Sequence, residues 1–265
     1  MPLMKLTTGR IYFRLEGEPG LPVLALLHPI GADHSLWDQV VPLLLPTHQV
    51  LRPDLRGHGG SDTEPGDRSL DQFVGDVIDL CGALGISSLH LCGISLGGFV
   101  AASVAKRRPE LVRSLTLCST AVKLLPPPGG WDGRAAAVRA QGMAFLADGM
   151  VQRMVSPGHR QEAAVGTLRT VFVRTDPEGY AGACAVLGEA DLSQIAPGVA
   201  AATLIVTGEQ DALVPADAGK ALLSHLAQAE HVSLPCGHFP PIEVPAAFAR
   251  ELLRWTGQRT GVGDC

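Results

Sequence analysis

Leu89-His90-Leu91-Cys92-Gly93-Ile94-Ser95-Leu96-Gly97-Gly98 is the stretch of sequence that decides the fold. Residues 89–92 form a short apolar run that is typical of a buried strand, and residues 98–106 suit a helix. A Gly-x-Ser-x-Gly turn between a strand and a helix predicts a sharp bend that exposes the serine hydroxyl. The glycines keep side chains away from the bend. We therefore expect Ser95 to be a nucleophile, against the alternative of a glycine-rich turn without chemistry.

Strands and helices are predicted to alternate on both sides of this turn. Apolar and β-branched runs predict strands at 10–16, 23–27, 49–52, 111–117, 203–206 and 231–234. Helical spacing and capping residues predict helices at 37–45, between Ser69 and Gly85, at 216–227 and at 246–255. Because parallel strands need crossover connections, this order predicts an α/β fold with a mostly parallel sheet.

The alternation is interrupted after the proline-rich segment 126–130. Residues 131–197 show helical spacing and no clear strand, with the strongest patterns at 135–145 and 163–173. We therefore predict one core domain formed by residues 1–122 and 198–265. Residues 123–197, which we call the cap, are predicted to be a helical insertion.

The overall composition favours a soluble globular protein. Of 265 residues, 46% are hydrophobic and 18% are charged, which argues against disorder. The net charge is −5 and no basic stripe is present, so we expect no nucleic-acid or membrane partner. The six cysteines include no Cys-x-x-Cys pair, so no metal site is expected. The N-terminus lacks a signal-peptide pattern, which favours the cytoplasm, and a homo-oligomer is left open.

A nucleophilic serine needs a histidine base and a carboxylate that orients it. On a sheet of this kind the chain order should be serine, acid, histidine. His238 follows the last predicted strand, whereas His225 lies in a helical segment and His231 begins a strand. Asp211 follows the strand at 203–206, with Glu209 as its nearest competitor. The sequence therefore predicts a triad of Ser95, Asp211 and His238.

Two backbone N–H groups should stabilise the negative charge that develops on an attacked carbonyl oxygen. Leu96 directly follows the nucleophile and is the first candidate. The loop after the strand at 23–27 should supply the second, and Pro29 has no N–H, so Ile30 is the better donor. The glycine-rich segment 57–60 lacks a Walker lysine and is interpreted as a structural turn. We expect no nucleotide and no cofactor.

Several motifs resemble the α/β-hydrolase superfamily. They are His28-Pro29-Ile30-Gly31-Ala32-Asp33, Trp37-Asp38, Asp54-Leu55-Arg56-Gly57-His58-Gly59-Gly60-Ser61-Asp62 and Gly93-Ile94-Ser95-Leu96-Gly97-Gly98. Three cap motifs resemble 3-oxoadipate enol-lactonases (beta-ketoadipate enol-lactone hydrolases). They are Trp131-Asp132-Gly133-Arg134-Ala135-Ala136-Ala137-Val138-Arg139, Pro177-Glu178-Gly179-Tyr180-Ala181-Gly182 and Ala190-Asp191-Leu192. The resemblance implies an eight-stranded sheet with a helical cap, and hydrolysis of an enol-lactone to 3-oxoadipate in aromatic catabolism without a cofactor.

The implied substrate carries a free carboxylate, so a cation in the cap would help to bind it. Trp131 and Arg134 lie three positions apart and would share one face of a helix, with Arg139 and Arg153 as further candidates. The alternative is that Trp131 packs the cap onto the body and Arg134 is solvated or paired. The segment 239–243 after the histidine departs from the family pattern, which bears on the exact substrate.

Other functions remain open at this point. A general carboxylesterase and a carbon–carbon bond hydrolase would use the same fold and the same nucleophile. A non-catalytic ligand-binding receptor on this fold is an alternative of another class, although a receptor has no chemical need for all three triad groups. Fold alone does not decide among these functions.

Overall fold

The structure is a computed structural model that describes residues 3–257. Its eight strands form a single sheet in the order β1-β2-β4-β3-β5-β6-β7-β8. The strands are β1 (Leu3–Leu6), β2 (Gly9–Glu16), β3 (Val23–Leu27), β4 (Gln49–Pro53), β5 (Leu89–Ile94), β6 (Val112–Cys118), β7 (Ala202–Gly208) and β8 (Ala229–Leu234). β2 runs antiparallel to both β1 and β4, and all pairs from β4 to β8 are parallel. The mostly parallel, eight-stranded α/β fold is therefore confirmed.

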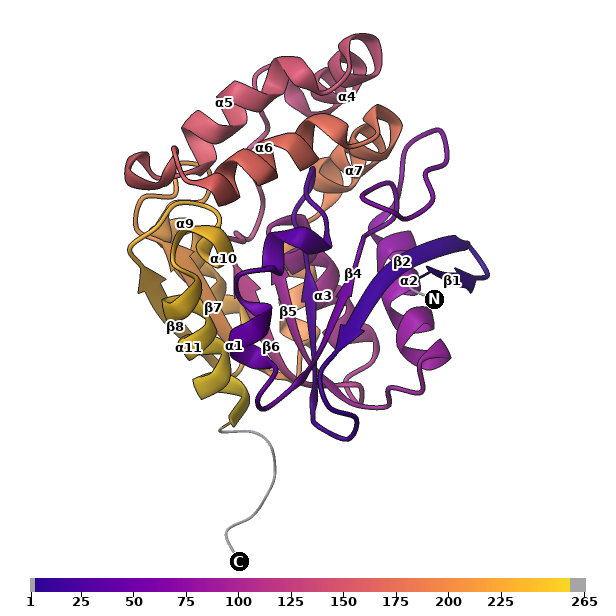
Figure 1. Cartoon of the computed structure of the whole chain (residues 1–265), viewed down its shortest axis with the longest axis vertical. Helices are drawn as coiled ribbons and strands as arrows, with labels where there is room; N and C mark the ends of the chain where they lie inside the picture. The colour runs from indigo at the N-terminus through magenta and orange to yellow at the C-terminus, as the bar shows by residue number, and fades with distance from the viewer. Residues whose placement is uncertain (1–2, 258–265) are drawn as a thin grey trace, which may run out of the picture.

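Helices cover both faces of the sheet (Figure 1). The body helices are α1 (Val41–Leu44), α2 (Leu70–Ala83), α3 (Leu96–Arg107), α9 (Ala216–Lys220), α10 (Pro240–Glu243) and α11 (Pro245–Gly257). Successive residues of a strand point to opposite faces, so Leu27 packs in the core on the α2 and α3 side. Its neighbour Leu26 packs on the α1 and α11 side. Every residue of β3 is buried, as two covered faces require.

A group of helices is inserted between β6 and β7. It contains α4 (Gly130–Gln141), α5 (Ala144–Met154), α6 (Ala163–Arg174), α7 (Pro177–Glu189) and α8 (Leu192–Ile195). In Figure 1, α4 to α7 lie together above one end of the sheet. No strand occurs in residues 131–197, all of which the structure describes, so their helical character is confirmed. The division of the chain at residues 122 and 198 stays a prediction.

Three predicted helices are broken in the structure. The segment 37–45 forms a 3-10 turn, η1 (His34–Trp37), and then the single turn of α1. The segment 135–145 spans two helices, because Gly142 adopts φ 73° and ends α4. The segment 216–227 is α9 followed by a 3-10 turn, η4 (Ala221–His225). In each case apolar spacing continues across a local backbone break that periodicity alone does not reveal.

No helix within residues 3–257 is long and apolar enough to cross a membrane. Five cysteines are buried with free thiols, at positions 81, 92, 118, 184 and 236. The sixth, Cys265, and the first two residues of the expected N-terminus lie outside the described residues.

Candidate active site

Ser95 lies in the sharp turn between β5 and α3. Its backbone adopts φ 52° and ψ −114°, a conformation that residues other than glycine rarely adopt. The residue is almost fully buried, and its N–H donates to the Cys118 carbonyl at the end of β6. A strained serine at the positive end of a helix is the arrangement expected of a nucleophile.

The two glycines that flank Ser95 allow this turn to fit into the fold. A Cβ atom at Gly93 would lie 2.1 Å from the Gly97 oxygen. A Cβ atom at Gly97 would lie 2.3 Å from the Leu27 oxygen. Both contacts are with backbone atoms, which cannot rotate away. The spacing Gly-x-Ser-x-Gly is therefore a steric requirement of the bend.

Asp211 and His238 are in direct contact at the ends of neighbouring strands. Nδ1 of His238 lies 2.8 Å from Oδ2 of Asp211, and both side chains are buried. The other Asp211 oxygen accepts hydrogen bonds from the N–H groups of Leu213 and Val214 at 2.8 and 2.9 Å. Burial alone would raise the pKa of Asp211, but His238 and these N–H groups lower it overall. This contact is the one expected between the acid and the histidine of a catalytic triad, in which the carboxylate holds the proton on Nδ1.

The competing residues do not share this contact. Glu209 is exposed, and its N–H continues the pairing with Leu234. The ring of His231 bonds to the hydroxyl of Thr207 at 2.9 Å. His225 lies in the 3-10 turn η4. Among the three histidines that sequence reasoning weighed, only His238 reaches the predicted acid.

The loop that carries His238 is tied to the cap by a residue that sequence reasoning missed. Glu243 is buried and accepts hydrogen bonds from the backbone N–H groups of Gly237 and Phe239. It also accepts from the backbone and hydroxyl of Ser156 in the cap. The only signal in the sequence was a carboxylate in an otherwise apolar segment that follows the histidine.

A cavity of about 200 Å³ separates the cap from the body at this position. Ser95 and His238 both line it, together with Pro29 and Ile30. The cap and its entry segment supply most of the remaining wall, with the residues Leu124, Leu125, Pro126, Pro127, Pro128, Trp131, Arg134, Arg153, Met154, Tyr180 and Leu187. This volume is small, so it suits a small molecule.

Two arginines give the cavity a cationic wall. Arg134 and Arg153 line it, and neither forms an ion pair with a carboxylate among residues 3–257. Burial raises the pKa of Tyr180 to about 12, so its phenol stays neutral. The charge of Arg134 acts to lower the pKa of the Tyr180 hydroxyl. Arg139, a further sequence candidate, instead pairs with Asp67 and Glu178 outside the cavity.

The two predicted N–H donors have no hydrogen-bond acceptor among residues 3–257. Leu96 is the first residue of α3, so its N–H has no partner within the helix. The Ile30 N–H donates to no acceptor within the part of the chain that the structure describes. Ile30 shares the cavity wall with Ser95. Within the described chain, the N–H groups of Ile30 and Leu96 are therefore left without a partner near Ser95.

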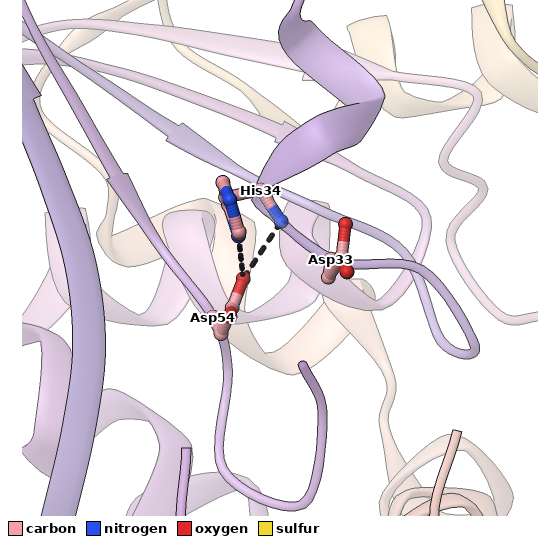
Figure 2. Close-up of side chains that lie close together, drawn as sticks. All are labelled: Asp33, His34 and Asp54. Atoms are coloured by element: carbon pink, nitrogen blue, oxygen red, sulfur yellow. Dashed lines mark hydrogen bonds and ion pairs between the residues drawn. The ribbon is translucent and has the colours of Figure 1, made fainter. Parts of the chain in front are cut away.

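A second cluster of polar side chains lies where the segment after β3 meets the loop after β4. Figure 2 shows Asp33, His34 and Asp54. The carboxylate oxygens and the ring nitrogen that these side chains could offer to a metal ion lie within 4.8 Å of one another. Asp54 Oδ1 accepts from both the backbone N–H and the ring Nδ1 of His34, at 2.7 and 2.8 Å. Asp33 Oδ1 accepts from the Ser35 N–H and hydroxyl. The two bonds between His34 and Asp54 join the segment after β3 to the loop after β4, whereas the Asp33–Ser35 bonds stay within the segment after β3.

Comparison with known proteins agrees with this geometry. A family model described as alpha/beta hydrolase fold matches residues 22–245. 3-Oxoadipate enol-lactonase 2 of Acinetobacter baylyi is 30% identical over 234 residues, covering 88% of this chain and 87% of that protein. The enol-lactonase structure from Burkholderia xenovorans LB400 is 32% identical, with a TM-score of 0.93, covering 97% of this chain and all of that one.

Another solved structure that is similar to this chain is named as an esterase. The structure of a thermophilic esterase from Thermogutta terrifontis with malate bound is 28% identical, with a TM-score of 0.88 and 97% coverage of both chains. The family model covers well over half of this chain, and the serine turn, the parallel sheet and the helical insertion all fit it. The chain therefore belongs to the alpha/beta-hydrolase fold family, as a carboxylic ester hydrolase.

Proposed function

We propose that the protein hydrolyses a small lactone or ester that carries a carboxylate, by a triad of Ser95, Asp211 and His238. The single observation that carries this proposal is the shared cavity. It brings the serine and the histidine together with two arginines that lack a carboxylate partner among residues 3–257.

The proposed reaction begins when the Ser95 hydroxyl attacks the carbonyl carbon and His238 Nε2 takes its proton. The Ile30 and Leu96 N–H groups stabilise the oxyanion of the tetrahedral intermediate. Collapse breaks the bond to the ring oxygen, which receives the proton from His238, and leaves an acyl-enzyme. His238 then deprotonates a water molecule that attacks the acyl group, and the proton returns to Ser95 as the carboxylate product leaves.

We propose 3-oxoadipate enol-lactone as the substrate. Two relatives of about 30% identity carry the name 3-oxoadipate enol-lactonase. The implied substrate has one distal carboxylate, which the guanidinium group of Arg134 can bind through charge-assisted hydrogen bonds. Trp131 forms part of the same wall and offers an apolar surface to the ring. A place in aromatic catabolism follows from this substrate and belongs to the same proposal.

A panel of lactones and esters with and without a distal carboxylate tests the proposal. We expect kcat/KM to favour the carboxylate-bearing substrates by at least tenfold, since one charge-assisted hydrogen bond contributes roughly 1.5–3 kcal/mol. The preference should fall in Arg134→Ala, while Arg139→Ala, which removes an arginine outside the cavity, should keep it. If the wild type turned over neutral esters as fast as the carboxylate-bearing substrates, a general carboxylesterase would be favoured instead. Full turnover by Ser95→Ala would exclude the serine mechanism.

A further inference from the structure

His28 lies directly before the loop that contains Ile30, and both of its ring nitrogens are engaged. The side chain is fully buried. Nε2 lies 2.8 Å from the backbone nitrogen of Leu55, and Nδ1 lies 2.8 Å from the Pro29 carbonyl oxygen. Because the Leu55 N–H can only donate, Nε2 must accept, so the ring proton is on Nδ1. Nδ1–H therefore donates to the Pro29 oxygen.

The acceptor of this bond belongs to the peptide group that carries the Ile30 N–H. The Pro29 C=O and the Ile30 N–H are part of one planar peptide unit, and no cis peptide bond occurs in residues 3–257. In a trans peptide the two bonds point in opposite directions. The Pro29 oxygen also accepts from the Ala32 N–H at 3.3 Å, across a turn in which Gly31 adopts φ 76°.

The orientation of this peptide is therefore fixed from the carbonyl side. His28 does not line the cavity, whereas Pro29, Ile30 and Ser95 do. Holding the oxygen on the buried side directs the N–H to the other side, where no protein acceptor meets it within the described chain. A donor fixed before the reaction needs no reorganisation when charge develops on the substrate oxygen.

We infer that His28 is a positioning residue that aims the Ile30 N–H at the carbonyl oxygen of the substrate. This inference rests on the serine mechanism proposed above. His28 does not touch the substrate and acts only through the Pro29–Ile30 peptide.

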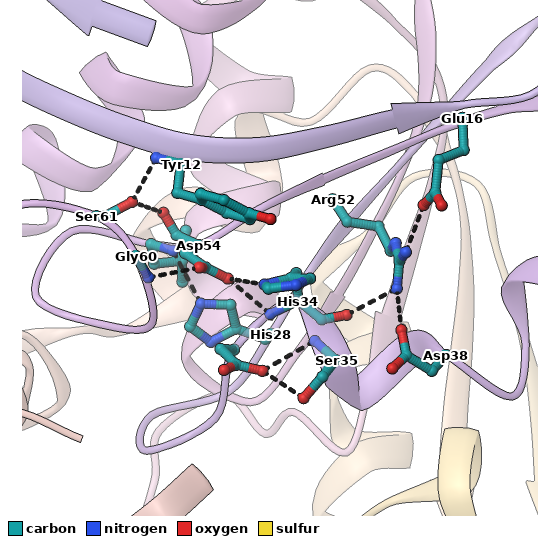
Figure 3. Close-up of polar contacts among 12 residues, drawn as sticks. Tyr12, Glu16, His28, His34, Ser35, Asp38, Arg52, Asp54, Gly60 and Ser61 are labelled. Carbon is teal, nitrogen blue, oxygen red and sulfur yellow. Dashed lines mark hydrogen bonds and ion pairs between the residues drawn. The ribbon is translucent and has the colours of Figure 1, made fainter. Parts of the chain in front are cut away.

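The surroundings of His28 keep the ring neutral and in place. Burial lowers the pKa of His28, against the opposing effect of Asp54, so the ring retains the unprotonated Nε2 that the Leu55 N–H requires. Asp54, the neighbour of Leu55, is held by His34 and by the Gly60 N–H at 2.8 Å. Figure 3 shows His28 beside this network, which joins the loops that follow β3 and β4.

Two substitutions of His28 each keep one of its two hydrogen bonds and remove the other. In His28→Asn, the side-chain amide can donate from about the position of Nδ1 to the Pro29 oxygen. In His28→Gln, the side-chain oxygen can accept from Leu55 at about the position of Nε2, and the bond to Pro29 is lost. With p-nitrophenyl acetate, we expect His28→Gln to lower kcat roughly 10- to 100-fold with little change in KM. The loss should be smaller than the one caused by deleting an oxyanion-hole N–H donor altogether. His28→Asn should recover most of that kcat.

A double-variant cycle provides the second measurement. Ile30→Pro deletes the N–H directly, at a turn position that accepts proline. If His28 acts through this N–H, adding His28→Gln to Ile30→Pro should lower kcat by less than threefold further, since the two changes remove one interaction. Thermal unfolding of each variant checks that it is folded. If His28→Gln does not fold, His28→Asn still tests the inference, because it loses the bond to Leu55 but keeps the bond to Pro29, and its kcat should stay close to the wild-type value.

The outcomes separate this inference from the proposed mechanism. Multiplicative losses in the double variant, or a loss confined to KM, would overturn the role of His28 while leaving the triad intact. Undiminished turnover by Ser95→Ala would instead remove the serine mechanism, whatever the His28 variants show. A kcat loss in His28→Gln that is absent from the Ile30→Pro background supports the positioning role.

Discussion

The hydroxyl of Ser156 lies 2.6 Å from Oε2 of Glu243, which joins the end of the cap helix α5 to the loop of His238. The carboxylate accepts four hydrogen bonds in all, two from Ser156 and one each from Gly237 and Phe239. The backbone N–H of His238 itself donates to the Met154 carbonyl at 2.6 Å. The backbone of the proposed base is therefore held as much by the cap as by the sheet.

Replacing Glu243 with Ala should destabilise the protein. The change leaves three buried backbone N–H groups and one hydroxyl without an acceptor. Each unsatisfied group costs about 1–3 kcal/mol, so we expect the free energy of unfolding to fall by about 3 kcal/mol or more. Denaturant unfolding measures this change. Glu189→Ala, at an exposed site on the last turn of α7, is the control, and equal losses in both variants would contradict the expectation.

Replacing Asp211 with Asn should preserve the shape of the site and abolish most activity. The amide can keep the hydrogen bond to Nδ1 only by stabilising the wrong tautomer of His238, and a comparable change in another serine hydrolase lowers kcat roughly 10⁴-fold. Steady-state kinetics measure the effect. The exposed neighbour Glu209, changed to Gln, should leave kcat within a factor of two, and a similar loss there would assign the acid to Glu209 instead.

Replacing Trp131 with Ala should widen the range of acyl groups. Trp131 lines the active-site cavity of about 200 Å³ and also an outer groove of about 760 Å³ between the cap and α2. Because Trp131 lines both, we expect the removal of its ring to connect the cavity with the groove. We expect the kcat/KM of p-nitrophenyl octanoate relative to the acetate to rise at least tenfold, the scale of burying two or more methylene groups at about 0.8 kcal/mol each. Asp132→Ala changes the groove alone, so its ratio should stay at the wild-type value.

Acid should unfold the protein partly through His90. This ring is buried beside His48, and burial lowers its pKa to about 4. An unfolded histidine has a pKa of about 6.5, so below that pH the unfolded state binds the extra proton. His90 therefore does not reduce the free energy of unfolding above about pH 6.5, and it reduces it progressively as the pH falls from 6.5 toward 4. The unfolding free energy, measured from pH 7 to 4.5, should fall less steeply in His90→Gln, and an unchanged slope would refute this role.

The strands could be predicted from the sequence because burial on both faces produces continuous apolar runs. The runs at 23–27 and 203–206 coincide with β3 and with the centre of β7. The edge strand β1 has mixed burial, so it gave no such pattern. The single turn of α10 was missed because Pro240 and Pro241 indicate a break, although proline fits the first turn of a helix.

The site could be predicted where chemistry dictates residue type and chain order, as for the contact of Asp211 with His238. The catalytic roles themselves stay predictions. Glu243 could not be assigned because its partners are backbone groups from distant segments, which leave no residue pattern. Arg153 was ranked below Arg134 because nothing in the sequence shows that α4 and α5 present both side chains to one cavity.

The insertion of the cap between β6 and β7 affects how the chain reaches its fold. These strands are adjacent and parallel, yet all five helices from α4 to α8 lie between them in the sequence. Their pairing closes a long loop, and loop-closure entropy grows only with the logarithm of length, about 0.6 kcal/mol per doubling. Lengthening or shortening the helices between Cys118 and Ala202 would therefore change the entropy of loop closure only slightly, whereas losing a contact such as that of Ser156 with Glu243 would cost far more. In terms of chain entropy, a turn of helix added to or removed from the cap leaves the cost of pairing β6 with β7 almost the same.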